Sequence, residues 1–350
     1  MKNFLIVLGV LTGMTAATGA QAAPCLIVTL TGTQGGPQAF QGIAGPGTLV
    51  RYGDDADNCS AVRMQFDAGR GTTLQLSRLG ITPMALHAVF FTHMHSDHSE
   101  GFIDLMQLRW HLGSRGPKVD VICSEDVRSP LGHTVSCKKF IDHIGDTLIQ
   151  SGEMAQRLAE DKNRLPGGPA DIANVRTFEA KDDPQPVWSS GDVKVSAIRS
   201  THIPGHASYR VDTPAGSVVI GGDAGNDKFA PPRPASTSDQ VERLAKGADI
   251  VVHSAIHPVM GPDKDSGMPP PIFFRQSMAS DLGAMAQRAG VKQLVLTHLI
   301  PPPGTDRQGL WKVPGGALTD DGWRKPVDES GFTGRTTVGR DLASVRLPAK

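Results

Sequence analysis

Short apolar runs rich in β-branched residues recur along the chain and are bounded by Gly, Pro, Asn or Asp. Runs of this kind, about four to eight residues long, are typical of β-strands. The predicted strands are 25–33, 48–53, 62–69, 86–93, 119–124, 193–203, 207–213, 217–227, 248–256 and 291–303. The tail "TTVGRDLASVRL" is expected to pack back as a final strand.

Segments with apolar residues at helical spacing separate many of these strands. The predicted helices are 71–80, 100–112, 138–163, 238–247 and 279–290. Gly145 and Gly152 are expected to break the third of them. In each half of the chain, strands come first and strand–helix units follow, which places the chain in the α/β class. A length of 350 residues allows one large α/β domain or two ordinary ones.

Residues 130–182 differ from their surroundings, because helical spacing and loop residues replace the strand pattern. We interpret them as a helical insertion in a single domain of residues 23–350. Such an insertion can form a lid or a wall of a substrate site, or it can be an ordinary layer packed on a sheet face. Helical amphipathicity alone does not separate these interpretations.

The N-terminus combines Lys2 and a short apolar run with Ala20-Gln21-Ala22, which has the form of a signal-peptidase cleavage site. The apolar run is short for a membrane span and breaks into Thr, Gly and Ala. We therefore expect residues 1–22 to be a cleaved signal peptide and the mature protein to be periplasmic or secreted. A buried first strand and a membrane anchor are the alternatives.

The chain has four cysteines, Cys25, Cys59, Cys123 and Cys137. In an exported protein an even number suggests disulfides, and four cysteines allow three pairings. The simplest pairing joins neighbours in sequence, Cys25 with Cys59 and Cys123 with Cys137. Metal binding by these cysteines is less favoured, because the chain has no C-x-x-C spacing.

The 35 basic and 35 acidic residues balance, so the formal net charge is zero. A chain without excess positive charge does not attract polyanions over distance, which argues against general nucleic-acid binding. After the signal segment, no apolar stretch is long enough to span a membrane. We therefore expect neither a nucleic-acid partner nor a membrane partner, and the sequence leaves formation of a homodimer open.

The segment "FFTHMHSDHSEG" places His93, His95, Asp97 and His98 within six positions, directly after an apolar run. Side chains at i and i+2 of an extended segment can point the same way, so His93 and His95 can bind one metal ion. Asp97 and His98 are expected on the following turn, where they can face a second ion. Imidazole and carboxylate together suit a borderline divalent ion such as Zn²⁺.

Four protein groups cannot complete two metal sites, so further ligands must come from elsewhere in the chain. His202, Asp223 and His298 each follow an apolar strand. Polar residues at the C-terminal ends of strands gather at one edge of an open sheet, where active sites form. Gly221 and Gly222, directly before Asp223, allow the backbone to approach an ion closely.

The segment His93-Met94-His95-Ser96-Asp97-His98 matches the HxHxDH motif completely, and His, Asp and His follow later in that order. In these features the chain resembles the metallo-β-lactamase superfamily. The segment "FDAGRGTTLQLSRLGI" is similar to the strand–Asp–helix segment of that family, in which Asp67 would support the metal loop and not bind metal. The resemblance covers essentially the whole mature chain. It implies an αββα sandwich of two mixed β-sheets with helices on the outer faces.

The resemblance implies seven ligands for two zinc ions. They are His93, His95 and His202 for the first ion, Asp97, His98 and His298 for the second, and Asp223 as a bridge between the two. His206 competes with His202 for its position. We prefer His202, because it ends the strand and precedes Tyr209 by seven residues.

The same resemblance implies a hydrolase in which two zinc ions lower the pKa of a bridging water and stabilise charge on the substrate. Asp97 and His253 are the candidate catalytic residues. His253 lies where ribonuclease Z-like and arylsulfatase-like members carry a catalytic histidine followed by Glu, and Ser254 takes the place of that Glu. His253 is therefore a candidate general acid without the carboxylate that would orient it, and a structural role is an equal alternative.

Within the superfamily the chain is most similar to exported arylsulfatase- and phosphodiesterase-like members. The spacing of 21 residues from His202 to Asp223 fits only a hairpin, whereas tRNA-maturing members carry a tRNA-gripping arm there. His95 stands where a di-iron redox branch has Glu, which favours hydrolysis. A small phosphodiester or an aryl sulfate ester is the expected substrate. Hydrolysis of a lactone, thioester or amide, or metal binding without turnover, are the alternatives.

Two Pro- and Gly-rich segments, 257–276 and 300–311, flank ligand strands and are expected to line the mouth of the site. His257 and Arg275 are candidates for contact with an anionic substrate, although both fit a surface position equally well. Apart from the two zinc ions, the expected ligand is a small anionic or ester molecule.

Overall fold

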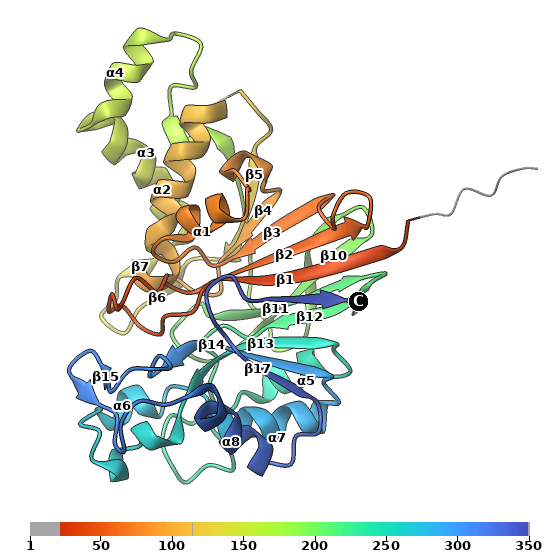
Figure 1. The fold of residues 1–350 in the computed structure, drawn as a ribbon. Helices are drawn as coiled ribbons and strands as arrows, with labels where there is room; N and C mark the ends of the chain where they lie inside the picture. The colour runs from red at the N-terminus through yellow and green to blue at the C-terminus, as the bar shows by residue number, and fades with distance from the viewer. Residues whose placement is uncertain (1–21, 114, 349–350) are drawn as a thin grey trace, which may run out of the picture.

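Residues 22–113 and 115–348 are described by the computed structural model, so the expected signal peptide lies outside the described residues except for Ala22. Two mixed β-sheets pack face to face, and helices cover the outer face of each sheet (Figure 1). The αββα sandwich expected from the sequence is thereby confirmed.

Each sheet has seven strands, one half paired antiparallel and the other half parallel. The first sheet contains, in spatial order, β18 (Ser344–Leu347), β1 (Pro24–Gly32), β2 (Gly47–Asp54), β3 (Val62–Phe66), β4 (Ala88–Phe90), β5 (Val119–Ser124) and β8 (Ala173–Phe178). The second contains β17 (Arg335–Val338), β14 (Gln293–Ile300), β13 (Ile250–Ile256), β12 (Gly216–Ile220), β11 (Ala207–Thr213), β10 (Val193–Arg199) and β9 (Gln185–Ser190).

Helices connect the parallel strands, because parallel neighbours need a long crossover and a helix supplies it. The helices over the first sheet are α1 (Thr72–Arg78), α2 (Ser96–Gly113), α3 (Cys137–Gln150) and α4 (Glu153–Glu160). Those over the second are α5 (Asp239–Ala245), α7 (Ala279–Ala289) and α8 (Asp320–Glu329). Each helical layer buries its apolar face against the strands beneath it, so the hydrophobic core has three parts, one between the sheets and one under each layer.

Short elements lie in the loops that connect the main strands and helices. They are the strands β6 (Val127–Arg128), β7 (Thr134–Val135), β15 (Arg307–Gln308) and β16 (Trp311–Lys312), the helix α6 (Pro270–Phe273), and the 3₁₀ turns η1 (Pro83–Ala85), η2 (Gly168–Ile172), η3 (Pro258–Met260) and η4 (Pro262–Lys264). In Figure 1, β6 and β7 lie on the same side of the molecule as β15 and α6.

Aromatic side chains occupy the centre of the core between the sheets. Phe66 on β3 and Phe90 on β4 stack with ring centroids 4.5 Å apart, and Tyr209 of the facing sheet packs against both rings. The Tyr209 hydroxyl donates a hydrogen bond to the carbonyl oxygen of Phe91 (2.6 Å), so its polar end is satisfied although the residue is fully buried. This contact ties the second sheet to the end of β4, where the histidine cluster begins.

Two helices differ from their predicted bounds. Helix α2 begins at Ser96, so Asp97 and His98 lie in its first turn. The sequence pattern predicted them on a turn that precedes the helix. Gly145 does not break α3, which runs to Gln150. A Cβ at position 145 would approach the carbonyl oxygen of Gly167 to 2.8 Å, so this glycine permits close packing of a loop against an intact helix.

The C-terminal part of the chain contains more structure than its sequence pattern predicts. The expected final strand is two strands, β17 in the second sheet and β18 in the first, so the tail crosses from one sheet to the other. Helix α8 contains Pro326, and its apolar contacts are concentrated in Trp323 and Val327. A segment with so few apolar positions and an internal proline has a weak helical pattern.

The segment 130–182 is partly a layer on the first sheet. Ile141 and Ile144 of α3 are buried in the same cluster as β5, and β8 extends the sheet at its edge. The hairpin of β6 and β7 spans the start of the segment, and its residues Val127 and Pro130 line a surface cavity described below. Among the described residues, no helix combines the length and the apolar character that a membrane crossing requires.

Both disulfides join the cysteines that are neighbours in sequence. Cys25 on β1 pairs with Cys59, with Cα atoms 5.4 Å apart, and Cys123 on β5 pairs with Cys137 at the start of α3, with Cα atoms 6.5 Å apart. The second bond fixes the N-terminal end of α3 to the sheet. The simplest of the three pairings is the one found.

Replacing Cys123 and Cys137 together by Ala is expected to lower the free energy of unfolding by about 3 kcal/mol, because a loop of this length loses its cross-link in the unfolded chain. Urea unfolding followed by circular dichroism measures the change. The Cys25→Ala/Cys59→Ala variant is the matched comparison. An unfolding midpoint equal to that of the unaltered protein would contradict the prediction.

Candidate metal centre

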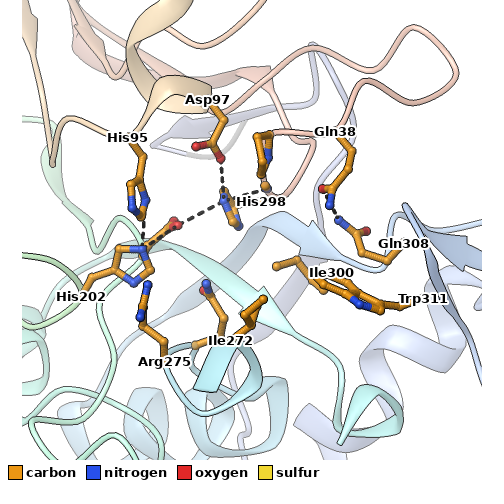
Figure 2. A pocket seen from close by; sticks show the side chains of 14 residues that line it. Gln38, His95, Asp97, His202, Ile272, Arg275, His298, Ile300, Gln308 and Trp311 are labelled. Atoms are coloured by element: carbon orange, nitrogen blue, oxygen red, sulfur yellow. Dashed lines mark hydrogen bonds and ion pairs between the residues drawn. The ribbon is translucent and has the colours of Figure 1, made fainter. Parts of the chain in front are cut away.

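The histidine cluster lies between the end of β4 and the start of α2. Strand β4 ends at Phe90, and Ser96 begins the helix, so His93 and His95 lie on the connection while Asp97 and His98 lie in the first helical turn. A carboxylate is favourable there, because the N-terminus of a helix carries partial positive charge. Figure 2 shows Asp97 and His95 entering the site from this side of the cavity.

Asp67, directly after β3, holds this connection in place. Its carboxylate accepts hydrogen bonds from the backbone N–H of Thr92 (2.7 Å), from the Thr92 hydroxyl (2.8 Å) and from Nδ1–H of His98 (2.8 Å). Asp67 has a positive φ of 54°, a conformation that non-glycine residues adopt rarely and mostly where the surroundings demand it. The contacts match the supporting role that the family resemblance implies for Asp67.

These hydrogen bonds also set which nitrogen each imidazole presents. Because Nδ1 of His98 donates to Asp67, its Nε2 carries the free lone pair. The Thr92 hydroxyl donates to Asp67 and so accepts from Nδ1–H of His93, 3.0 Å away. Nε2 of His93 is therefore free as well. One carboxylate and one hydroxyl prepare two imidazoles as ligands.

Three sets of ligand atoms converge, each set lying within 4.8 Å. They are His93, His95 and His202; His93, His98 and Asp223; and Asp97, His98 and His298. In the first set, Nδ1 of His95 lies 2.9 Å from Nε2 of His93 and 3.3 Å from Nε2 of His202. Two nitrogens bound to one tetrahedral zinc ion at about 2.0–2.1 Å are about 3.4 Å apart, so these spacings are close to those that zinc needs.

Asp223 lies between the sets. Its Oδ2 is 3.1 Å from Nε2 of His298, 3.4 Å from Nε2 of His98 and 3.7 Å from Nε2 of His202. The preceding Gly222 has a φ of 61°, and a Cβ there would come within 2.9 Å of both Nε2 of His206 and Cβ of Thr92. Glycine at this position therefore lets the carboxylate reach the centre.

His298 does not end its strand but forms a bulge within it. The pairing of β13 with β14 shifts between Ser254 and Ala255, and His298 is the residue of β14 left without a partner. It has a φ of 45°. A bulge redirects a side chain, and here Nε2 of His298 is brought to 3.3 Å from Oδ2 of Asp97.

The hydrogen bonds of His202 and His206 show which of the two imidazoles is available to a metal ion. Nδ1 of His206 is 2.8 Å from the Ser200 hydroxyl, and its Nε2 accepts from the backbone N–H of Asp223 (3.1 Å). Both nitrogens of His206 are thereby used within the protein. Nε2 of His202 faces His95, so the geometry favours His202 as the ligand.

Burial and neighbouring charge shift the pKa values of these groups in different directions, and metal binding needs neutral imidazoles and ionised carboxylates, so His98 must release a proton when an ion binds. Burial lowers the pKa of His202 to about 3 and that of His93 well below its usual value, so both imidazoles are neutral at neutral pH. Burial alone would raise the pKa of Asp97, but the nearby His98 and His298 hold it at about 2. Burial likewise opposes the charged form of His98, yet Asp223, Asp67 and Asp97 raise its pKa well above the usual value.

The residues present fit a divalent metal. Nε2 of His98 and Oδ1 of Asp223 are buried without a hydrogen-bond partner, and both belong to side chains aimed at the common centre. Buried polar atoms are normally satisfied, and imidazole with carboxylate is the donor set of zinc sites. An ion bound at the common centre would satisfy both of these atoms.

His253 lies outside the cavity that opens onto the metal centre and is described below. It is fully buried, its Nδ1 donates to the carbonyl oxygen of Ser254 (2.8 Å), and its Nε2 has no partner among the described residues. Burial lowers its pKa. A Cβ on Gly221 would lie 2.1 Å from Cδ2 of His253, so the ring packs directly against that glycine. His253 does not line the cavity at the centre, and its role as general acid stays a prediction.

A cavity of about 240 Å³ opens onto the centre. Besides metal-centre residues, its lining includes Gly36, Pro37, Gln38, Ile272, Arg275, Gln276, Ile300, Gln308 and Trp311. Segments 257–276 and 300–311 thus line the site as expected. The contribution of the loop at 36–38 was not predicted; its only signal in sequence is the run Gly35-Gly36-Pro37.

His257 and Arg275 have different positions. His257 accepts from the backbone N–H of Val259 (3.1 Å) and its ring packs edge-on to Trp323, so it is a structural residue beneath a loop. Arg275 lies in the cavity beside His202 (Figure 2).

Known proteins share this sequence pattern. Residues 63–299 match the family profile described as the Beta-lactamase superfamily domain. Ribonuclease Z of Mycobacterium bovis (strain BCG / Pasteur 1173P2) is 26% identical over 326 residues, which cover 92% of this chain and 98% of that protein. Ribonuclease Z of Mycobacterium sp. (strain KMS) is 28% identical over 288 residues, covering 82% of this chain and 88% of that protein.

Solved structures share the fold. The metallo-beta-lactamase fold protein YhfI from Bacillus subtilis has a TM-score of 0.56 at 18% identity, covering 92% of this chain and 99% of that one. Human tRNase Z, short form (ELAC1), has a TM-score of 0.58 at 17% identity, covering 92% of this chain and 100% of that one. The matched profile spans more than half of the chain, and the protein therefore belongs to the beta-lactamase superfamily, as a metallo-hydrolase of the metallo-β-lactamase fold.

Proposed function

We propose that this protein is an exported, dinuclear zinc hydrolase that cleaves small phosphodiesters. The observation that carries the proposal is the position of Asp223, whose Oδ2 lies within 3.7 Å of His98, His202 and His298. A carboxylate shared in this way by two ligand sets is suited to bridge two ions. His93, His95 and His202 would hold one ion, and Asp97, His98 and His298 the other.

The relatives and the fold of one segment support the choice of bond and substrate size. The curated relatives are named ribonuclease Z, and a ribonuclease cleaves phosphodiester bonds. In this chain, the residues from His202 to Asp223 contain only the hairpin of β11 and β12, which provides no arm for gripping a large RNA. The neutral net charge also disfavours a polyanion. A small diester fits these observations better than a nucleic acid.

Export accounts for the cysteines. Both pairs form disulfides, and such bonds persist in oxidising compartments. The predicted signal peptide of residues 1–22 would deliver the chain to such a compartment.

A pair of zinc ions, when bound, supplies Lewis-acid activation of water and of the ester. Hydrolysis adds the hydroxyl of water to phosphorus, breaks the bond from phosphorus to the leaving oxygen, and passes a proton to that oxygen. Asp97 lines the cavity as an ionised carboxylate and can orient the attacking water by accepting its hydrogen bond. The apolar side chains of the cavity exclude bulk water, which strengthens electrostatic interactions within it.

Replacing His202 by Gln is expected to remove at least one of two zinc ions per chain, whereas His206→Gln should retain both. The Gln amide at 206 can still accept from the backbone N–H of Asp223, so this variant is the matched control. Inductively coupled plasma mass spectrometry measures zinc, and circular dichroism checks folding. Loss of zinc from the 206 variant with full zinc in the 202 variant would reverse the assignment.

A substrate panel for the zinc-loaded protein separates the bond types. We expect kcat/KM for bis(p-nitrophenyl) phosphate to exceed that for p-nitrophenyl sulfate and for a γ-lactone by tenfold or more, roughly the discrimination that one well-placed interaction provides. Apoprotein prepared with a chelator should be inactive and should recover activity with Zn²⁺. Preference for the sulfate or the lactone would replace the phosphodiester with that substrate, and inactivity on all three would favour metal binding without turnover.

His253→Ala tests the acid role through the leaving group. An ester that releases p-nitrophenolate needs no proton, so its turnover should change little, while a phenyl ester should slow by about 100-fold or more. Zinc content should be unaltered in the variant. If both esters keep their turnover, or if both slow to the same extent, His253 is not the proton donor.

A further inference from the structure

The cavity at the metal centre has two chemically different ends. Figure 2 shows His95, Asp97 and His202 at one end, and Trp311 with Ile300 at the other, where the side chains of Gln38 and Gln308 also lie. Ile272 of α6 completes the apolar end, so three separate segments of the chain build it. An apolar end beside a polar reaction centre is typical of a site that binds a substrate with one apolar group.

Arg275 is the single cationic side chain, histidines aside, among the described residues that line this cavity. Its guanidinium makes no ion pair and no hydrogen bond with any described residue. The guanidinium carbon lies over the ring of Phe229, 6.0 Å from the ring centroid. Arg199, which lines the neighbouring cavity, is by contrast committed to Asp182 (2.6 Å) and Asp227 (3.6 Å). A half-buried guanidinium with five donors and no acceptor is suited to bind an anionic oxygen.

The position of Arg275 places it beside the reacting group. It lines the cavity at the metal centre and also a second cavity of about 750 Å³, and His202 is the other large polar residue common to both. In Figure 2, Arg275 lies next to His202, on the opposite side of the cavity from Asp97. An oxygen bound by Arg275 would therefore belong to the group that reacts at the centre and not to a remote part of the substrate.

The cavity as a whole has room for one aromatic ring. A cavity of about 150 Å³ is enough to hold benzene, and the whole cavity here is about 240 Å³. Trp311 is half-buried and lines the cavity, and Ile272 is 37% exposed. Large apolar side chains left open to a cavity are stabilised when a ligand covers them.

The surrounding charge disfavours a polyanion. A single-stranded nucleic acid binds along a groove lined with several cations. Here the second cavity presents Glu125 and Glu179 and an arginine already paired with acidic residues. Beyond the proposed zinc ions, Arg275 is the one arginine or lysine among the described residues that line the metal-centre cavity, which favours a substrate of low negative charge.

We propose that the substrate is a monoanionic ester with an aromatic group, in which Arg275 binds the anionic oxygen and the ring packs between Ile272, Ile300 and Trp311. The proposal rests on the phosphodiesterase function above and names its substrate class. Arg275 is then a substrate-binding residue, and Trp311 determines specificity.

Binding of phosphonates to the zinc-loaded protein tests the assignment without turnover. Isothermal titration calorimetry with the monomethyl esters of phenylphosphonate and methylphosphonate, each a monoanion, should give at least tenfold tighter binding of the phenyl compound, about the gain from covering one ring. Trp311→Ala should abolish this preference. Leu310→Ala, the matched control in the same hairpin, should keep it, because Leu310 is 94% exposed.

Arg275→Gln should weaken both phosphonates by about 10- to 100-fold and leave their ratio unchanged, since a charged hydrogen bond to the anion is lost. Arg288→Gln, at a surface ion pair with Glu242, is the control and should bind as the unaltered protein does. Arg275→Gln and Trp311→Ala should also raise KM for phenyl phosphodiesters, whereas the two control variants should not.

Failure of this inference differs from failure of the proposed function. Equal binding of the two phosphonates, or unchanged binding in Arg275→Gln, would overturn the substrate assignment even if the enzyme hydrolyses phosphodiesters. The expected binding pattern without any hydrolysis would support the two subsites and overturn the phosphodiesterase function.

Discussion

The candidate site depends on one buried carboxylate. Asp67 accepts hydrogen bonds from Thr92 and His98, and through the Thr92 hydroxyl it also orients His93. A buried carboxylate is costly unless its oxygens are satisfied, and these donors come from the segment that follows the neighbouring parallel strand. The charge of Asp67 therefore fixes the path of the chain from β4 into α2 and the direction of two imidazoles at once. Removing the Asp67 carboxylate would leave His93 and His98 in place without the hydrogen bonds that orient their rings.

The sandwich brings the remaining ligands to the same edge. In both sheets the parallel strands run toward the metal centre, with β4 delivering the histidine cluster and β12 and β14 delivering Asp223 and His298. Two local distortions complete the approach, the left-handed Gly222 and the bulge at His298. Strain of this kind persists only where the surrounding fold enforces it, and here the closely packed core between the sheets provides that support.

Features encoded locally could be predicted from the sequence, while those that depend on contacts between distant segments could not. The cluster at 93–98 could be recognised because its spacing is unusual in itself, and β13 because five of its seven residues are apolar and all seven are buried. The bulge at His298 and the intact helix through Gly145 result from packing against other elements, which no local pattern records. The same holds for Gln38, whereas Trp311 lies in the segment 300–311 that the sequence placed at the mouth of the site. Gln308 of the β15–β16 hairpin donates to the carbonyl oxygen of Gly35, bringing two segments together that lie more than 260 residues apart.

The β15–β16 hairpin carries a consequence for how such a protein can diversify. Its strands are two residues each and belong to neither large sheet, yet it carries Trp311 into the cavity. Ion binding and ligand choice are thus encoded by separable stretches of the chain. Substitutions in this small surface hairpin can alter which compounds bind, while the strained residues that form the metal centre stay unchanged.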